Sequence, residues 1–204
     1  MSTIITPLAY TGSIGMWAFM TTAETLLVEQ NDYYQKQTLR NRTHIHGANG
    51  KLLLSIPIRH LGKTGHQYYN KVEIENSFKW QKQHWKSIQS AYRSSPYFEF
   101  YEDDISIFYK NKFSLLYVFN KAYFKLLLKL LGWNPEVHYT ESYKNLTNAK
   151  DIRSQIEKKE VNNKLKLKYT QVFEGKNGFI PNLSILDLLF NEGPNTLSLL
   201  KTVV

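Results

Sequence analysis

The 204-residue sequence predicts a single α/β domain in which a mixed or mostly parallel sheet is flanked by helices. Three observations lead to this fold class. The first thirty residues have the pattern of a strand, a helix and a second strand. Long segments further on carry apolar residues at helical spacing, and short apolar runs of strand length lie around them. A chain of this length buries the core of one domain without disulfide bridges, and the sequence contains no cysteine.

The N-terminal segment is expected to form a βαβ unit. Residues 3–9 and 25–29 are runs of strand length, and residues 12–23 place Ile14 and Trp17 at helix-like spacing. This order favours two parallel strands joined by a crossover helix. In such sheets ligands bind beyond the carboxyl ends of the strands. The chain contains neither GxGxxG nor GxxxxGKS/T, so it predicts no dinucleotide fingerprint and no P-loop.

Four further strands are expected, at residues 51–58, 71–75, 136–140 and 165–172. The first follows a Gly-Ala-Asn-Gly turn and is strongly apolar, which predicts a buried strand. The second and the fourth alternate polar with apolar residues, and the second has the pattern of an edge strand.

Helices are expected at residues 77–92, 96–111, 113–131 and 184–191, with Ser77 and Ser184 as caps of the first and last. In the third helix, Lys121, Lys125 and Lys129 recur every four residues and so share one face. Three charges in this segment disfavour a membrane span, and we expect no transmembrane segment. The start of the chain lacks the basic stretch of a secretory signal, so we expect a cytoplasmic protein.

The basic charge of the chain is concentrated in one segment. The formal net charge is +9, and residues 144–168 contribute 8 − 3 = +5 of it. This segment is rich in Asn and Lys and weakly periodic, which predicts a mobile, solvated basic insertion over residues 144–166. Because the excess is local and no nucleic-acid motif accompanies it, nucleic-acid binding is not favoured. His60 and His66 lie in a loop without nearby carboxylates, so no metal site is expected.

The main candidate site is a polar cluster that follows the second strand. Its members are Lys36, Gln37, Arg40, Asn41 and Arg42. Whether the segment is extended or helical, at least two of its three cations share a face. Arginine donates two parallel hydrogen bonds to a phosphate or carboxylate. The cluster therefore predicts a site for an anionic small molecule, with a structural ion pair as the alternative.

Three other residues are candidates for the same site. His84 lies on the inward row of the helix at 77–92, where it is either a half-buried histidine bonded to the backbone, or a group at a site rim that acts as acid or base or donates to an anion. Asn182 and Asp187 accompany the capped helix at 184–191, where they are either local capping residues or ligand contacts.

Three ordered blocks resemble the WbqC-like protein family. At residues 34–57 the block reads Y-x-K-Q-T-x-R-N-R, then GANG and L-S-I-P; at 80–98 it reads W-x-x-x-H-W-x-x-I-x-x-A-Y-x-x-x-P-Y-F. At 169–194 it reads Y-T-Q-V-F, then G-F-x-P-N-L-S-I-L-D-L-L-F-N-x-G-P. Longer relatives open with P-Y-x-P-x-I-x-Y, whereas this chain has PLAYTGSIGMW, so the resemblance implies no N-terminal site residues.

The resemblance implies a bacterial protein with a role in surface polysaccharide synthesis of the O-antigen type. It implies no catalytic residues and no cofactor. Three function classes stay open: a transferase acting on nucleotide-linked sugars or an acyl or aminoacyl donor, a non-enzymatic binding module or subunit of a glycan-assembly complex, and a nucleic-acid-binding protein. Oligomeric state is not indicated by the sequence.

Overall fold

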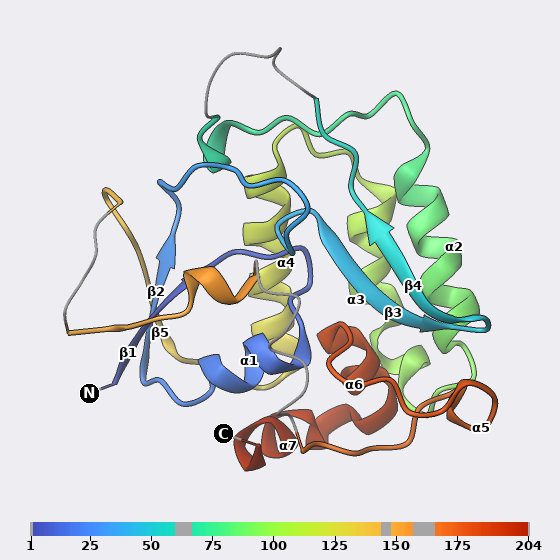
Figure 1. The fold of residues 1–204 in the computed structure, drawn as a ribbon. Coiled ribbons are helices and arrows are strands. Elements are labelled where there is room, and N and C mark those ends of the chain that lie inside the picture. The colour runs from blue at the N-terminus through green and yellow to red at the C-terminus, as the bar shows by residue number, and fades with distance from the viewer. Residues whose placement is uncertain (1, 60–66, 144–147, 157–165, 204) are drawn as a thin grey trace.

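A parallel sheet organises one side of the molecule (Figure 1). The computed structural model describes residues 2–59, 67–143, 148–156 and 166–203. Over these residues the sheet has the order β5-β2-β1-β6, and its strands are β1 (Thr3–Pro7), β2 (Thr25–Glu29), β5 (Glu136–Tyr139) and β6 (Lys150–Asp151). All neighbouring pairs are parallel. The predicted α/β class with a mostly parallel sheet and flanking helices is confirmed.

Helix α1 (Ile14–Met20) connects β1 to β2 as the βαβ unit requires. Its first turn is capped twice: the Ser13 hydroxyl accepts a hydrogen bond from the Met16 amide, and Asn182 Oδ1 accepts one from the Gly15 amide at 2.7 Å. Trp17 is almost fully buried and stacks on Phe124 of the later helix α4, with ring centroids 5.4 Å apart. The crossover helix is therefore fixed by its cap at one end and by aromatic packing along its length.

A separate antiparallel hairpin follows β2 in the chain. It consists of β3 (Arg42–Gly47) and β4 (Gly50–Ser55). The Gly-Ala-Asn-Gly turn forms as predicted, with Gly50 at φ 96. The expectation of a buried strand is wrong for this run, because Leu52 and Leu53 are 40% and 43% exposed. The short turn pairs the run with the strand just before it, which keeps it out of the parallel sheet.

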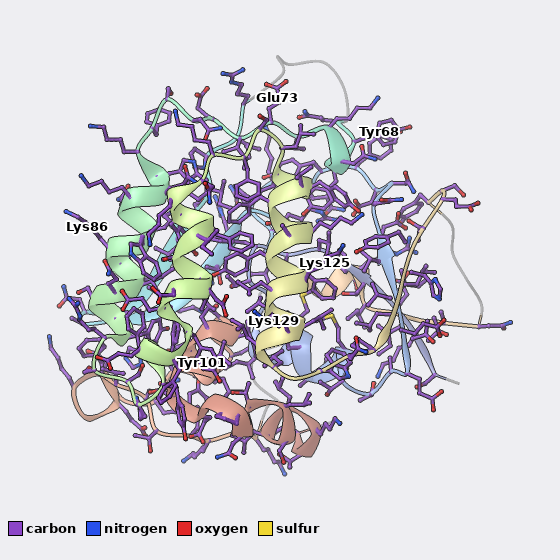
Figure 2. The ribbon with its side chains drawn as sticks, turned by 180° about the vertical axis from the view of Figure 1, so that it is seen from behind. Tyr68, Glu73, Lys86, Tyr101, Lys125 and Lys129 are labelled. Carbon is purple, nitrogen blue, oxygen red and sulfur yellow. The ribbon has the colours of Figure 1, made fainter. Side chains whose placement is uncertain are left out.

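Three long helices stand side by side behind the hairpin (Figures 1 and 2). They are α2 (Trp80–Tyr92), α3 (Phe98–Lys110) and α4 (Leu116–Leu130), each close to its predicted range. The cap of α2 is Lys79, not Ser77. On α4, Lys125 and Lys129 are exposed while Phe119 and Tyr123 are buried, as the four-residue spacing predicts. Among the described helices, none is long and apolar enough to cross a membrane.

Two predicted strands do not form. Residues 71–75 make single bridges, Ile74 to Ile58 and Glu73 to Leu115, instead of a continuous ladder. Residues 166–172, the described part of the other segment, contain no strand. In both segments the apolar positions are buried all the same. Alternating polar and apolar residues indicate which side chains face the core. Those side chains are buried here without pairing of the backbone to a neighbouring strand.

Part of the predicted basic insertion belongs to the sheet. Lys150–Asp151 form β6, and the Ile152 amide donates to the Ile5 carbonyl at 2.9 Å. Lys150 and Asp151 are exposed, whereas Ile152 and Arg153 are 1% and 5% exposed, so the burial of residues 152 and 153 departs from the expected solvated segment. A short 3-10 turn, η2 (Arg153–Ile156), follows. Residues 144–147 and 157–165, on which the rest of this expectation falls, lie outside the described residues.

The C-terminal part packs against α1 and α3. Its elements are α5 (Glu174–Asn177), α6 (Ile185–Glu192), the turn η4 (Gly193–Asn195) and α7 (Thr196–Thr202). Ser184 caps α6 as predicted, because its hydroxyl accepts a hydrogen bond from the Leu186 amide. The Ser184 amide in turn donates to the His44 carbonyl, which ties α6 to the hairpin.

Candidate functional site

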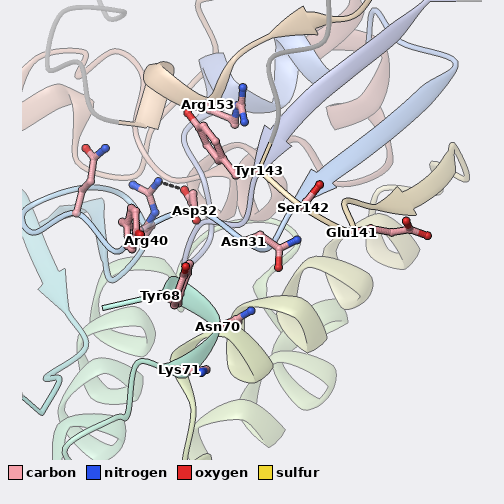
Figure 3. A pocket seen from close by; sticks show the side chains of 12 residues that line it. Asn31, Asp32, Arg40, Tyr68, Asn70, Lys71, Glu141, Ser142, Tyr143 and Arg153 are labelled. Carbon is pink, nitrogen blue, oxygen red and sulfur yellow. Dashed lines mark hydrogen bonds and ion pairs between the residues drawn. The ribbon is translucent and has the colours of Figure 1, made fainter. Parts of the chain in front are cut away.

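A pocket opens at the carboxyl ends of the parallel strands (Figure 3). Its volume is about 620 Å³. This strand-end pocket is lined by Asn31, Asp32, Tyr33, Gln35, Arg40, Tyr68, Asn70, Lys71, Glu141, Ser142, Tyr143 and Arg153. Residues 31–33 follow β2, residues 141–143 follow β5, and Arg153 follows β6. Tyr68, Asn70 and Lys71 come from the 3-10 turn η1 (Tyr69–Lys71) and the residue before it, and a bridge between Tyr33 and Tyr68 joins this turn to the segment after β2.

Asp32 and Arg40 form an ion pair on the pocket wall (Figure 3). The guanidinium donates to Asp32 Oδ2, and the two side chains are only 7% and 1% exposed. Arg40 also lies over the Tyr69 ring, 5.6 Å from its centroid. Burial raises the pKa of the Asp32 carboxyl, and the charge of Arg40 opposes that rise. The pair is therefore a fixed, charge-compensated unit rather than an open cation.

A second ion pair lies at the ends of β2 and β6. Arg153 donates to Glu29 Oε2 at 2.9 Å and also pairs with Asp151. The other Glu29 oxygen, Oε1, accepts from the Thr140 hydroxyl at 2.7 Å and from the Asn31 amide at 2.8 Å. Glu29 is fully buried, so these donors offset the cost of removing its charge from water. The network fixes the loop ends that form the pocket.

Three tyrosines present ring faces to the pocket. The rings of Tyr33 and Tyr68 are stacked, with centroids 4.8 Å apart and an interplanar angle of 23°. Both remain nearly half exposed. Tyr143 is 54% exposed, and the Arg153 guanidinium carbon lies 4.3 Å from its ring centroid. Exposed aromatic faces in a concave site suit stacking against a flat ligand.

The predicted cationic cluster is divided by the fold. Arg40 lines the strand-end pocket, whereas Lys36, Gln37 and Arg42 do not. Lys36 and Gln37 are exposed, and Gln37 has a φ of 63. Arg42 begins β3. The charges of Arg40 and Arg42 both act on Tyr34, whose pKa is raised to about 12 by burial and held back by the two arginines. The structural ion pair that the sequence left open is present for Arg40.

Two predicted asparagines hold the backbone. Asn41 is buried, and its Nδ2 donates to the Ile56 carbonyl at 2.9 Å. Asn182 has a φ of 53, and its Oδ1 caps α1 through the Gly15 amide. Neither residue lines the strand-end pocket.

His84 lies in the core instead of at a site rim. It is 4% exposed, and its Nδ1 lies 2.9 Å from the Tyr10 hydroxyl. The Tyr10 hydroxyl is 2.8 Å from that of Tyr109, which is 3.4 Å from that of Tyr123. Burial lowers the pKa of His84 to about 4, and a hydrogen bond to the Ser55 backbone opposes that change. Of the two alternatives predicted from the sequence, the structural histidine bonded within the fold matches this position, and His84 is more deeply buried than expected.

Asp187 is also deep in the structure. Its two oxygens accept hydrogen bonds from the Tyr92 and Tyr169 hydroxyls, each at 2.7 Å. Burial raises the pKa of the Asp187 carboxyl, and the two hydroxyls oppose the rise. Gln171 links Tyr169 to the buried His46 ring through its amide. Asp187 therefore joins α6 to α2 and does not line the strand-end pocket.

Several lining residues were not predicted. Residues 141–143 follow the predicted strand at 136–140, so the strand-end rule alone could have identified them. Arg153 lies in the segment that was expected to be a solvated insertion. Tyr68 comes from a loop without periodicity, and Lys71 begins the alternating segment at 71–75, whose pattern did not point to a ligand site.

The described residues contain no candidate metal site. Over residues 2–59, 67–143, 148–156 and 166–203, no group of three or more His, Asp or Glu side chains is arranged to hold a metal ion. His60 and His66 lie outside these residues.

Comparison with known proteins gives a family but no activity. The model of the WbqC-like protein family matches residues 9–166 and 154–199. The "Uncharacterized protein Rv1507c" of Mycobacterium tuberculosis is 24% identical over 207 residues, covering 88% of this chain and 88% of that protein. No solved structure matches. Because the family model spans most of its length, the chain belongs to the WbqC-like protein family.

Proposed function

We propose that the protein binds a nucleotide-linked sugar in the strand-end pocket and acts on it as a transferase in surface polysaccharide synthesis. The observation that carries this proposal is the position of the pocket. It lies where the carboxyl ends of β2, β5 and β6 meet, the place at which open parallel sheets bind their ligands. A volume of about 620 Å³ is within the usual range for sites that take small molecules and cofactors.

The charges of the pocket support an anionic ligand of limited charge. Its lining contains three cations and two carboxylates, Asp32 and Glu141, which gives 3 − 2 = +1. Two of the cations, Arg40 and Arg153, are engaged in ion pairs. Lys71 is exposed, and among the described residues no carboxylate lies within ion-pair distance of it. Lys71 is therefore the residue proposed to contact a phosphate.

The aromatic lining supports the rest of the donor. A nucleobase or the C–H face of a sugar gains from packing on an exposed tyrosine ring. Tyr33, Tyr68 and Tyr143 offer such faces around one opening. A phosphate contact flanked by rings fits a nucleotide-linked sugar better than a free phosphate. A cytoplasmic location belongs to the same proposal, because such donors are made inside the cell.

The proposal is tested by ligand-induced stabilisation. The probes are UDP-, GDP- and dTDP-hexoses, the matching nucleoside diphosphates, and acetyl-coenzyme A. A ligand at 100 times its Kd raises the free energy of unfolding by about 2.7 kcal/mol. We expect at least one nucleotide-linked hexose to stabilise the protein, Lys71→Ala to weaken that effect, and Lys125→Ala to leave it unchanged. Lys125 is the matched control because it is an exposed lysine on α4.

Two results would overturn the proposal. One is the absence of stabilisation by every nucleotide-linked hexose at millimolar concentration. The other is stabilisation by acetyl-coenzyme A alone, which would assign the pocket to an acyl donor. If a ligand binds but no transfer to a saccharide acceptor follows, the chain is a binding subunit and the transferase part of the proposal is wrong.

A further inference from the structure

Two acceptor oxygens on the wall of the strand-end pocket lack hydrogen-bond partners. Within the described residues, neither Asp32 Oδ1 nor Asn70 Oδ1 accepts a hydrogen bond, and both atoms are buried. A buried acceptor without a donor costs about 1–3 kcal/mol. Most buried polar atoms in proteins are paired, so two such oxygens on one pocket are a departure from the rule. Both residues line the same cavity, where a ligand is the available source of donors.

The Asp32 carboxylate is held in place for such a role. Its Oδ2 is held by Arg40, and the Asp32 carbonyl accepts from the Tyr69 amide at 2.9 Å. The side chain is 7% exposed. Oδ1 is covered by the atoms of the lining, but χ2 of aspartate and asparagine is a soft torsion. A small rotation about χ2 turns both carboxylate oxygens together, so Oδ1 moves toward the cavity while the backbone stays in place.

The stacked rings of Tyr33 and Tyr68 belong to the same two segments as the acceptors, and Figure 3 shows Tyr68 between Asp32 and Asn70. Tyr33 follows Asp32 directly, and Tyr68 precedes Asn70 by two residues. A bridge between Tyr33 and Tyr68 holds the two segments side by side. Each segment thus contributes one aromatic ring and one unpartnered oxygen to the same wall.

We infer that this wall is the subsite for the sugar ring of the donor. Hydroxyl groups of a hexose donate to Asp32 Oδ1 and Asn70 Oδ1, while a C–H face of the ring packs on Tyr68. A hexose has both features, because hydroxyl donors lie around its rim and apolar C–H groups lie on its faces. The inference rests on the proposed function and adds to it which wall holds the sugar.

Other ligand groups fit these oxygens less well. A phosphate carries acceptors only, so it is repelled by a carboxylate oxygen and cannot donate to it. A divalent cation such as Mg²⁺ or Ca²⁺ takes six or more oxygen ligands. The Arg40 guanidinium beside Asp32 also opposes a second positive charge. The phosphate contact therefore stays with Lys71, and the acceptor wall is left for hydroxyl groups.

The test separates the sugar from the rest of the donor. Affinities of a nucleotide-linked hexose and of its nucleoside diphosphate are measured by calorimetry for the parent, Asp32→Asn, Asn70→Ala and the control Asp103→Asn. Asp103 is an exposed carboxylate on α3, outside the pocket. Free hexose at tens of millimolar is examined in parallel by saturation-transfer NMR.

We expect the sugar-bearing donor to bind the parent more tightly than the diphosphate. Asn70→Ala and Asp32→Asn should each weaken the donor by about tenfold, which corresponds to about 1.4 kcal/mol, and leave the diphosphate within about twofold. Asp103→Asn should change neither. Asn70→Ala keeps the ion pair of Asp32 and Arg40, so it remains informative if Asp32→Asn does not fold.

The outcomes distinguish the inference from the proposed function. Equal binding of the donor and the diphosphate, with no saturation transfer to free hexose, overturns the sugar subsite and leaves the nucleotide site. Saturation transfer that the two variants abolish, without nucleotide binding, keeps the subsite and overturns the proposed function. Absence of both signals overturns both.

Discussion

The Arg153 guanidinium donates to Glu29 Oε2 at 2.9 Å although 124 residues separate them. This contact joins the end of β2 to the short strand β6, at the floor of the strand-end pocket. Strand β6 has only two residues, so its ladder alone offers little to hold it. The ion pair, with the neighbouring Thr140 hydroxyl, therefore fixes both the sheet edge and the pocket.

Removal of the Arg153 charge should destabilise the fold. In Arg153→Met the carboxylate of Glu29 stays buried and loses its cation, and such a loss costs about 3–5 kcal/mol. Urea unfolding measures the change. The control is Arg59→Met, because Arg59 pairs with Glu73 while about half exposed. Exposed pairs contribute about 1 kcal/mol or less. Equal effects of the two variants would contradict the structural role of the Arg153 pair.

His84 should make the protein acid-sensitive. Its pKa is about 4 in the fold and 6.5 as a free side chain, so between these values the unfolded chain binds more protons. Stability therefore falls as pH decreases from about 6.5 to about 4, by about 3 kcal/mol for this group. Unfolding at several pH values should show a shallower loss for His84→Gln. An unchanged slope in His84→Gln would contradict the burial of an uncharged histidine.

Asp187 should matter for stability and not for ligand binding. Asp187→Asn replaces one acceptor oxygen by a donor beneath the Tyr92 and Tyr169 hydroxyls. The free energy of unfolding should fall by about 1–3 kcal/mol, while a ligand of the strand-end pocket keeps its affinity for the folded variant. Calorimetry on folded Asp187→Asn measures that affinity. A loss of binding in a stable variant would restore Asp187 as a ligand contact.

Hydrogen exchange should show that β6 is part of the sheet. The Ile152 amide is bonded to the Ile5 carbonyl and is buried, so it should exchange as slowly as amides of β1. Composition alone predicts fast exchange throughout residues 144–163. Fast exchange at Ile152, equal to that of an exposed loop amide, would contradict the placement of β6.

The sequence predicted those helices and strands whose own residues show an apolar run or a regular apolar spacing. The runs at 25–29 and 136–140 and the helices at 77–92 and 113–131 carry strong periodicity, and each forms. The run at 51–58 is equally apolar, but apolarity does not specify a pairing partner, and its turn directs it into a hairpin. A two-residue strand such as β6 is too short to have any periodicity.

One residue of the predicted polar cluster, Arg40, lines the strand-end pocket, together with Asp32 of the same loop after β2. The strand-end rule does not say which side chains of the following loop turn inward, and Lys36 and Arg42 turn out not to line the pocket. Tyr68 and Lys71 are brought to the same pocket by tertiary packing, and neither the loop before residue 71 nor the alternation at 71–75 indicates that contact.

One lysine variant and one arginine variant test most directly the central claim that the ligand binds in the strand-end pocket. The polar cluster predicted from the sequence includes Arg42 as an anion contact, whereas the proposed function assigns that contact to Lys71, which lines the strand-end pocket. The measurement is the affinity of a nucleotide-linked hexose for Lys71→Ala and for Arg42→Ala, determined by calorimetry on variants shown to be folded. The account predicts that Lys71→Ala weakens binding by about tenfold and that Arg42→Ala stays within about twofold of the parent. Weakened binding in Arg42→Ala with unchanged binding in Lys71→Ala would contradict the account, because the ligand would then lie outside the strand-end pocket.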